Sequence, residues 1–327
     1  MTSTNTNLLY FSYLREGKYL QFNEYLKQCR EENHLTQEQL VSELYTHDIE
    51  QFGGLDARAL SKWEKSVIKP KVAKQVSIIK YFQKRTGVPL PCWSHYSVDE
   101  AEELICKAGM RNIIGKNKSF VCNFPSELMN VDDMKVYPVR NFQRMDALIE
   151  SNMHIHQNFN HKFTQISREQ FREWALHPSN LFLACEYKDS FLGFFFTARV
   201  RPEIFDKILN FKMKKSEITT SDFASFDEIG SHLLLSFYAM NMKAATMLTV
   251  RYYAHLIANQ KNIDEIGGVT TNDDAKKIAS NMNLHYHSSY TTNDNIKIKS
   301  YRQTLANVLA SENAVKMFLV KQECPEE

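Results

Sequence analysis

Apolar residues near the start of the chain recur at the spacing of amphipathic helices. A first helix is predicted by four apolar positions at i, i+3, i+4 and i+7: Phe22, Tyr25, Leu26 and Cys29. A second helix is predicted after Thr36, because a threonine followed three residues later by a glutamine, here Gln39, is a capping-box pattern. A third is predicted from Asp56, a favoured N-cap residue, to Glu64. Short helices in succession predict a small all-α domain.

The third of these helices has an unusual polar face. Leu60 and Trp63 are its inward-facing apolar positions, which leaves three polar or basic residues facing outward: Arg58, Ser61 and Lys62. Such side chains on an exposed helix suit the base edges and phosphates of a DNA major groove. The pattern therefore predicts a DNA-reading helix.

These segments resemble the XRE/Cro-type helix-turn-helix regulators. The likeness rests on three runs of the chain: LTQEQL at 35–40, LSKWEK at 60–65 and KP at 69–70. The resemblance implies that Gln37 contacts the operator backbone or a base edge and that Trp63 anchors the core. It also implies that Arg58, Ser61 and Lys62 face the groove.

Two features depart from the usual pattern of that family. The turn between the second and third helices is normally tight, but residues 45–54 add roughly ten residues here. Val41 replaces the small residue usual where the two helices cross. Three roles are open for the added loop: it packs on the domain, contacts DNA, or loosens the motif and weakens binding.

Basic residues are concentrated around and after the third helix. Between Leu60 and Thr86 there is one acidic residue, Glu64, and eight basic ones: Lys62, Lys65, Lys69, Lys71, Lys74, Lys80, Lys84 and Arg85. The whole chain has a net charge of only +2, so the excess is local. Phosphate neutralisation makes such a patch a source of salt-dependent affinity, and we assign Lys65, Lys69 and Lys71 to phosphates. The alternative is a small helical domain whose lysines form a solvated face.

The next part of the chain is a helix followed by a transition. Pro70 is expected to begin the helix, with an apolar stripe at Val72, Val76, Ile79 and Phe82. The sequence GVPLP at 87–91 breaks this pattern, and Ser97 then caps another short helix. Residues 109–133 are irregular in pattern. The predicted organisation is a helix-turn-helix domain at 12–86, a connecting module at 87–133, and a second domain at 134–320.

The second domain is predicted to be mixed α and β. Apolar and alternating runs predict strands at 135–139, 181–187, 191–200, 231–238, 263–269, 284–288 and 296–301. Helical patterns fall at 142–153, 167–174, 243–260 and 274–282. The expected fold class is multidomain: an all-α domain followed by an α/β (α+β) domain with a mixed sheet.

This order of elements resembles the GNAT N-acetyltransferase fold over residues 134–320. In that family a central strand is followed by a turn, with signature [QR]-x-x-G-x-[GA], whose backbone N–H groups hold the coenzyme A pyrophosphate. The resemblance places an acyl-CoA site, for acetyl-CoA or another acyl-CoA, at six residues: Asn241, Met242, Lys243, Ala244, Ala245 and Thr246. Neither glycine of the signature is present, and a Cβ at that turn crowds a phosphate. Residues 266–275 and 282–284 match the last strand–helix pair of the family better.

Candidate catalytic residues are few. Acetyl transfer needs a base, and Glu228, just before the central strand, is the best-placed carboxylate, although a solvated strand-end residue is the plainer interpretation. Tyr286 or Tyr290 is the candidate general acid. Histidines at 154, 156 and 161 lack partners at metal-ligand spacing, and His285 and His287 share one face of a strand, so no metal site is predicted. Met240, Met242 and Met247 are interpreted as core-filling.

Composition limits the class of protein. A chain of 327 residues with 43% hydrophobic and 12% aromatic residues suggests two packed domains with little disorder. No apolar run approaches the roughly 18 residues of a membrane span, and residues 1–7 lack the apolar core of a secretion signal. Six scattered cysteines without a CxxC pair are expected to be reduced thiols: Cys29, Cys92, Cys106, Cys122, Cys185 and Cys324. A cytoplasmic protein of a bacterium or phage is expected.

The sequence as a whole predicts a transcriptional regulator that binds a specific sequence of double-stranded DNA. We expect a homodimer, because one module of this size rarely reaches specific affinity alone. The GNAT-like domain is expected to sense a small-molecule effector or to mediate assembly rather than to be an enzyme. Two alternatives remain: an active acyl-CoA-dependent N-acyltransferase that carries a DNA-binding domain, and a purely structural dimerisation body.

Overall fold

An all-helical block is followed by a block of mixed helices and strands. The computed structural model describes residues 21–114, 129–140, 142–159, 166–271, 273–293 and 295–318. The first block holds α1 (Phe22–Glu32), α2 (Gln37–His47), α3 (Ile49–Phe52), α4 (Ala57–Glu64) and α5 (Val72–Thr86). Within the described ranges no helix is both long and apolar enough to cross a membrane.

Local capping fixes where the helices of the first block begin. The Thr36 side chain accepts from the Gln39 N–H at 3.1 Å, and the Gln39 side chain accepts from the Thr36 N–H at 2.8 Å. Asp56 Oδ1 accepts from the Ala59 N–H at 2.6 Å. Both predicted helix starts are confirmed. The predicted start of the next helix is wrong by two residues, because Lys71 is the N-cap and Pro70 precedes it in a buried position.

The inserted residues 45–54 pack on the helical block. They form the end of α2 and the short helix α3, whose Phe52 is fully buried. Asp48 caps α3 by accepting from the Gln51 N–H at 3.1 Å. Its other carboxylate oxygen accepts from the Ser77 hydroxyl of α5 at 2.9 Å. Of the three roles left open for this loop, packing on the domain is the one that the structure shows.

The second block is built on a seven-stranded mixed sheet in the order β1-β2-β3-β4-β5-β7-β6. Its strands are β1 (Met134–Pro138), β2 (Leu181–Tyr187), β3 (Ser190–Val200), β4 (Gly230–Ala239), β5 (Ile263–Thr270), β6 (His285–Thr291) and β7 (Lys297–Thr304). The β4–β5 pair is parallel, and the other neighbouring pairs are antiparallel. All seven predicted strands occur, with bounds shifted by up to three residues. The mixed sheet expected for the second domain is therefore present.

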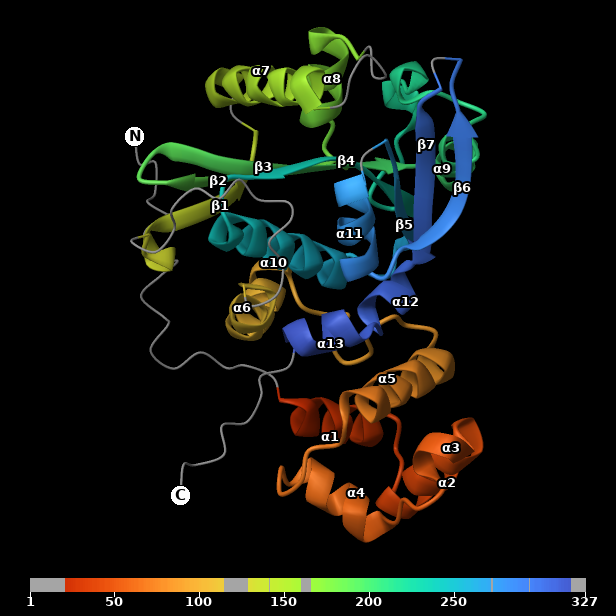
Figure 1. The fold of residues 1–327 in the computed structure, drawn as a ribbon. Helices are drawn as coiled ribbons and strands as arrows, with labels where there is room; N and C mark the ends of the chain where they lie inside the picture. Colours follow the sequence, from red (N-terminus) through yellow and green to blue (C-terminus); the bar gives the residue numbers. More distant parts are fainter. Residues whose placement is uncertain are drawn as a thin grey trace.

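Helices cover both faces of the sheet (Figure 1). One face carries α7 (Phe142–Phe159), α8 (Arg168–Leu176) and α9 (Pro202–Leu209). The other carries α10 (Met242–Ala258), against which α6 (Val98–Ile114) packs. Three further helices follow late in the chain: α11 (Asp273–Asn281), α12 (Leu305–Leu309) and α13 (Glu312–Phe318). Short 3-10 turns lie at Val131–Asp133, Lys215–Glu217 and Thr220–Asp222.

The helix α9 was not predicted, and it packs closely on β5. A Cβ at Gly267 would lie 2.8 Å from the Phe205 ring and 3.0 Å from a Leu209 methyl, so the absence of a side chain lets α9 approach. Residues 201–229, between β3 and β4, thus cover part of the sheet face opposite α10.

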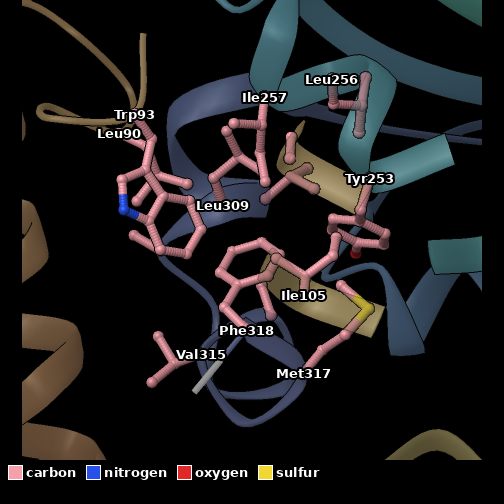
Figure 2. Packing of buried hydrophobic residues seen from close by; sticks show 14 of the residues in the cluster. Leu90, Trp93, Ile105, Tyr253, Leu256, Ile257, Leu309, Val315, Met317 and Phe318 are labelled. Carbon is pink, nitrogen blue, oxygen red and sulfur yellow. The ribbon is translucent and has the colours of Figure 1, made fainter. Parts of the chain in front are cut away.

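A continuous apolar core joins the two blocks. The segment predicted as a connecting module holds the 17-residue helix α6, which is longer than expected and packs against α10 and α13. Trp93, buried just before α6, meets Phe318 of α13 with ring centroids 5.6 Å apart. Phe318 in turn meets Tyr253 of α10 at 5.8 Å (Figure 2). The region between the blocks is therefore part of the packed interior.

Candidate functional site

The outward face of α4 is the first candidate site. Arg58 and Lys62 are exposed and Ser61 is half-buried, while Leu60 and Trp63 are buried on the opposite side. Positions 58, 61 and 62 are three and four residues apart, so they share one face of the helix. The helix lies at the end of the molecule farthest from the sheet (Figure 1). The structure thus brings together the three residues predicted to face DNA.

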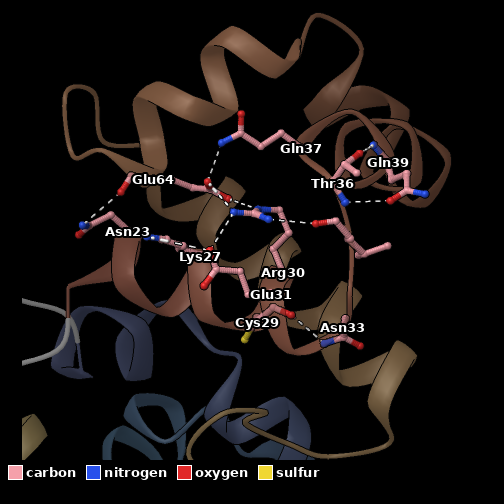
Figure 3. Close-up of polar contacts among 11 residues, drawn as sticks. Asn23, Lys27, Cys29, Arg30, Glu31, Asn33, Thr36, Gln37, Gln39 and Glu64 are labelled. Atoms are coloured by element: carbon pink, nitrogen blue, oxygen red, sulfur yellow. Dashed lines mark hydrogen bonds and ion pairs between the residues drawn. The ribbon is translucent and has the colours of Figure 1, made fainter.

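A buried carboxylate at the end of α4 links this helix to α1 and α2. Glu64, 8% exposed, accepts from Arg30 Nε at 2.6 Å and from Arg30 Nη2 at 3.1 Å (Figure 3). It also accepts from Gln37 Nε2 at 2.7 Å. The hydrogen bonds to Glu64 raise the pKa of Arg30. This network ties α1, α2 and α4 together. No local sequence pattern reveals it, because its members lie 27 and 34 residues apart.

The same network constrains Gln37, which was predicted to contact DNA. Its amide group is held toward Glu64 by one N–H. A side-chain amide has two N–H donors, so a phosphate contact by Gln37 would use the second one.

The basic run does not form a single surface. Lys65, Lys69 and Lys71, the predicted phosphate contacts, are all exposed just after α4. Arg85 instead pairs with Glu43 of α2. Burial, with smaller contributions from Lys84 and Lys80, lowers the pKa of His47, so those two lysines lie near the end of α2. The positive charge available beside α4 is therefore smaller than the sequence count of eight suggested.

The second candidate site is the point where β4 and β5 separate. Their parallel pairing ends at Leu234 and Gly268, although β4 continues to Ala239. Leu235 has no partner in the register between β3 and β4, which makes it a β-bulge. A bulge bends its strand, so β4 turns away from β5. Ligands of α/β sheets bind outside the carboxyl ends of parallel strands, and this opening lies there.

A lysine that the sequence did not single out reaches this opening. Lys215 Nζ donates to the Val269 carbonyl near the end of β5 at 3.1 Å. Burial lowers the pKa of this amine to about 8. The lysine opens a 3-10 turn held by Gln170 of α8, whose amide donates to the Ser216 and Ile218 carbonyls at 2.8 and 3.0 Å. No local pattern around residue 215 would have revealed this position.

The turn predicted to hold coenzyme A is closed by the chain itself. Asn241 caps α10, and its side-chain oxygen accepts from the Ala244 N–H at 2.9 Å. Lys243 Nζ donates to the Met129 carbonyl at 2.6 Å. Ala244, Ala245 and Thr246 are buried. With that N–H engaged and no glycine present, the residues of this turn do not fit a pyrophosphate as they stand.

The predicted catalytic residues are not gathered at the opening. Glu228 precedes β4 and lies at the opposite end of this ten-residue strand from Asn241, roughly 30 Å of strand away. Hydrogen bonds from Ser225 lower the pKa of Glu228, which makes it a weaker base. Tyr286 and Tyr290 are exposed on the edge strand β6. Two strands, β5 and β7, separate β6 from β4.

Where the structure describes them, the histidines considered as metal ligands lie on α7 and β6. His154 is exposed on α7, while the side chain of His156 and the whole of His161 lie outside the described residues. His287 on β6 is hydrogen-bonded to Asn210 at 3.1 Å. Among the residues that the structure describes, no three His, Cys, Asp or Glu side chains are grouped to hold a metal ion.

Comparison with known proteins finds only distant structural similarities. No protein-family model matches this sequence, and no curated protein does. Among solved structures, an N-acyl amino acid synthase from uncultured soil microbes is similar at 10% identity and a TM-score of 0.39, over 57% of this chain and 97% of that one. An N-acetyltransferase from Staphylococcus aureus Mu50 is similar at 13% identity and 0.37, over 53% and 98%. An aminoglycoside 6'-acetyltransferase type Ii gives 10% and 0.35, over 53% and 96%. Scores this low say nothing about activity.

Proposed function

We propose that this chain is a DNA-binding transcriptional regulator that reads its operator with α4. One observation carries the proposal: Arg58, Ser61 and Lys62 share the outward face of a short helix at the far end of the molecule. Arg58 and Lys62 are suited to base edges, and Ser61 to a base or a phosphate. Lys65, Lys69 and Lys71 follow as phosphate contacts that set orientation.

The support behind α4 favours this function. A recognition helix must keep a fixed direction, and Glu64 at the end of α4 is held by Arg30 and Gln37 from two other helices. Asp56 fixes the other end by capping. We further propose a homodimer on two half-sites about one helical turn apart, since one such module supplies too few contacts for specific affinity.

The test begins with selection of duplexes from a random library by the purified full-length protein. Binding of an enriched duplex is then measured by fluorescence anisotropy. Arg58→Ala and Lys62→Ala are each expected to weaken binding by about 1–3 kcal/mol, roughly 5- to 150-fold, and to relax preference at one base position. Lys69→Ala is expected to weaken binding to all duplexes alike and to reduce its salt dependence.

Lys80→Ala is the matched control, because Lys80 is an exposed lysine of α5 that lies near His47 rather than beside α4. It should bind as the unchanged protein does. Failure to enrich any duplex, or an unchanged base preference in both α4 variants, would refute the proposal.

A second candidate function is acyl transfer from an acyl-CoA. The observation that favours it is the opening between β4 and β5, with the Lys215 amine at its edge. The closed turn at Asn241 speaks against it. A thermal melt with acetyl-CoA and longer acyl-CoAs tests it, because a ligand of the folded state raises the midpoint. A clear rise in the midpoint, followed by turnover with an amine, would favour an enzyme. An unchanged midpoint would leave DNA-binding regulation as the single proposed function.

A further inference from the structure

Two cysteines far apart in the sequence meet between the helical block, α1 to α5, and the rest of the described fold, which we call the body. Cys29 of α1 and Cys92 are free thiols whose sulfurs lie 3.0 Å apart. Both are buried, Cys29 completely and Cys92 to 5% exposure. The sequence showed only scattered cysteines, because these two are separated by 63 positions.

The backbone around Cys92 is adapted to this contact. Cys92 has a φ of +70°, in the left-handed region that residues other than glycine rarely adopt. Such a conformation persists only where the surroundings hold it. Here the N–H of Leu90, two residues before Cys92, donates to the Gln260 side chain at 2.6 Å, and Trp93, directly after Cys92, is buried in the core. The body therefore presents the Cys92 sulfur to α1.

We propose that Cys29 and Cys92 form a reversible disulfide that staples α1 of the helical block to the body. Formation of the disulfide removes one hydrogen atom from each thiol. Two electrons pass to an oxidant, which here is a peroxide. A thiolate of one cysteine attacks the peroxide, giving a sulfenic acid and releasing hydroxide. The second thiol then attacks that sulfur, forming the S–S bond and releasing water.

Position in the fold gives the bond its effect. Cys29 belongs to the helix that carries Arg30, the partner of Glu64 at the end of α4. Cys92 belongs to the segment that leads into α6 and the body. A covalent link here restrains the helical block relative to the sheet. Because both sulfurs are buried, we expect slow formation that follows local opening of residues 87–97.

Intact mass spectrometry and tryptic mapping of full-length protein treated with hydrogen peroxide test the proposal. We expect a loss of about 2 Da, reversed by dithiothreitol. We also expect a link between peptides 28–30 and 86–107, together with a higher thermal midpoint of the oxidised form. Cys29→Ala and Cys92→Ala should each abolish the link. Two separate variants are used so that the test still holds if one of them fails to fold.

Cys106→Ala is the matched control, because Cys106 lies on the same tryptic peptide as Cys92 and should be dispensable for the link. The proposal would be overturned if Cys29 and Cys92 could still be alkylated after a treatment with peroxide that had oxidised the other thiols. A link from Cys29 to Cys106, or one that survives in Cys92→Ala, would overturn it as well.

Discussion

Glu64 shows how single side chains set the geometry of the proposed DNA-binding face. It is charged and buried, and three hydrogen bonds from Arg30 and Gln37 offset the cost of removing it from water. Removing one partner of such a pair leaves a buried charge uncompensated. The direction of α4 therefore depends on a residue that does not face DNA.

Arg30→Ala is expected to lower the free energy of unfolding by about 3–5 kcal/mol, because Glu64 would remain buried without its main partner. Urea denaturation measures this. The control is Arg85→Ala, which removes a more exposed pair with Glu43 and should cost about 1 kcal/mol or less. Equal costs for the two variants would contradict the role given to burial.

Two neighbouring histidines, His232 of β4 and His255 of α10, should make stability depend on pH. His232 is buried and its ring lies 5.6 Å from that of His255. Burial lowers the pKa of His232 well below 6.5 and that of His255 to about 4. Both are neutral in the folded state, whereas in the unfolded chain they take up protons below about pH 6.5. Their contribution is thus present above pH 6.5 and lost as pH falls toward 4.

The urea concentration at the midpoint of unfolding should therefore fall as the pH is lowered from 7.5 to 4.5. His255→Gln should make this fall smaller, since glutamine does not titrate. An identical pH profile in the variant would exclude His255 as a contributor.

Local interactions at single residues were predictable, and distant ones were not. The caps at Thr36 and Asp56 act over three residues, so the sequence pattern contains them. The contacts of Glu64 with Arg30 and of Lys215 with Val269 span 34 and 54 residues. They depend on how elements pack, which no local pattern encodes.

Among the elements, the inserted helix α3 has the clearest structural role. Phe52 fills the helical block, while its neighbour Ile49 on the same helix is 58% exposed. Phe52→Ala should lower the free energy of unfolding by about 3–5 kcal/mol through the cavity it leaves. Ile49→Ala, the matched control, should change it by less than about 0.5 kcal/mol. Small, equal effects in a thermal melt would mean that the insertion is dispensable for packing.

Strands were easier to predict than short helices. The strands β2 and β3 were evident from two apolar runs, and the two-residue turn that joins them has positive φ at Lys188 and Asp189, as tight hairpins require. The helix α9 was missed although Pro202 at its start and Ile204, Phe205 and Ile208 on one face were visible signals. The opening at Leu235 was unpredictable, because a bulge depends on the register between strands.

At the scale of the whole molecule, the two blocks share one core and should unfold together. Leu26, Trp93, Tyr253 and Phe318 all belong to one buried cluster. We expect a single thermal transition of the unchanged protein by calorimetry, with a calorimetric enthalpy equal to the van't Hoff enthalpy. Phe318→Ala should lower the midpoint of that transition, and the control Leu176→Ala should not. Two separate midpoints in otherwise unchanged protein would show that the blocks are independent.

The position of α12 and α13 along the chain also determines when the apolar core can be closed during synthesis on the ribosome. Gln83 of α5 donates to the Ala306 carbonyl 223 residues later, and Trp93 packs on Phe318. The helical block is made more than 200 residues before the surface that covers Trp93. At about 5–20 residues per second, the exposed apolar face waits roughly 10 to 45 seconds for its partner. Nascent chains halted before residue 305 should therefore depend on chaperones more than chains that already include α12 and α13.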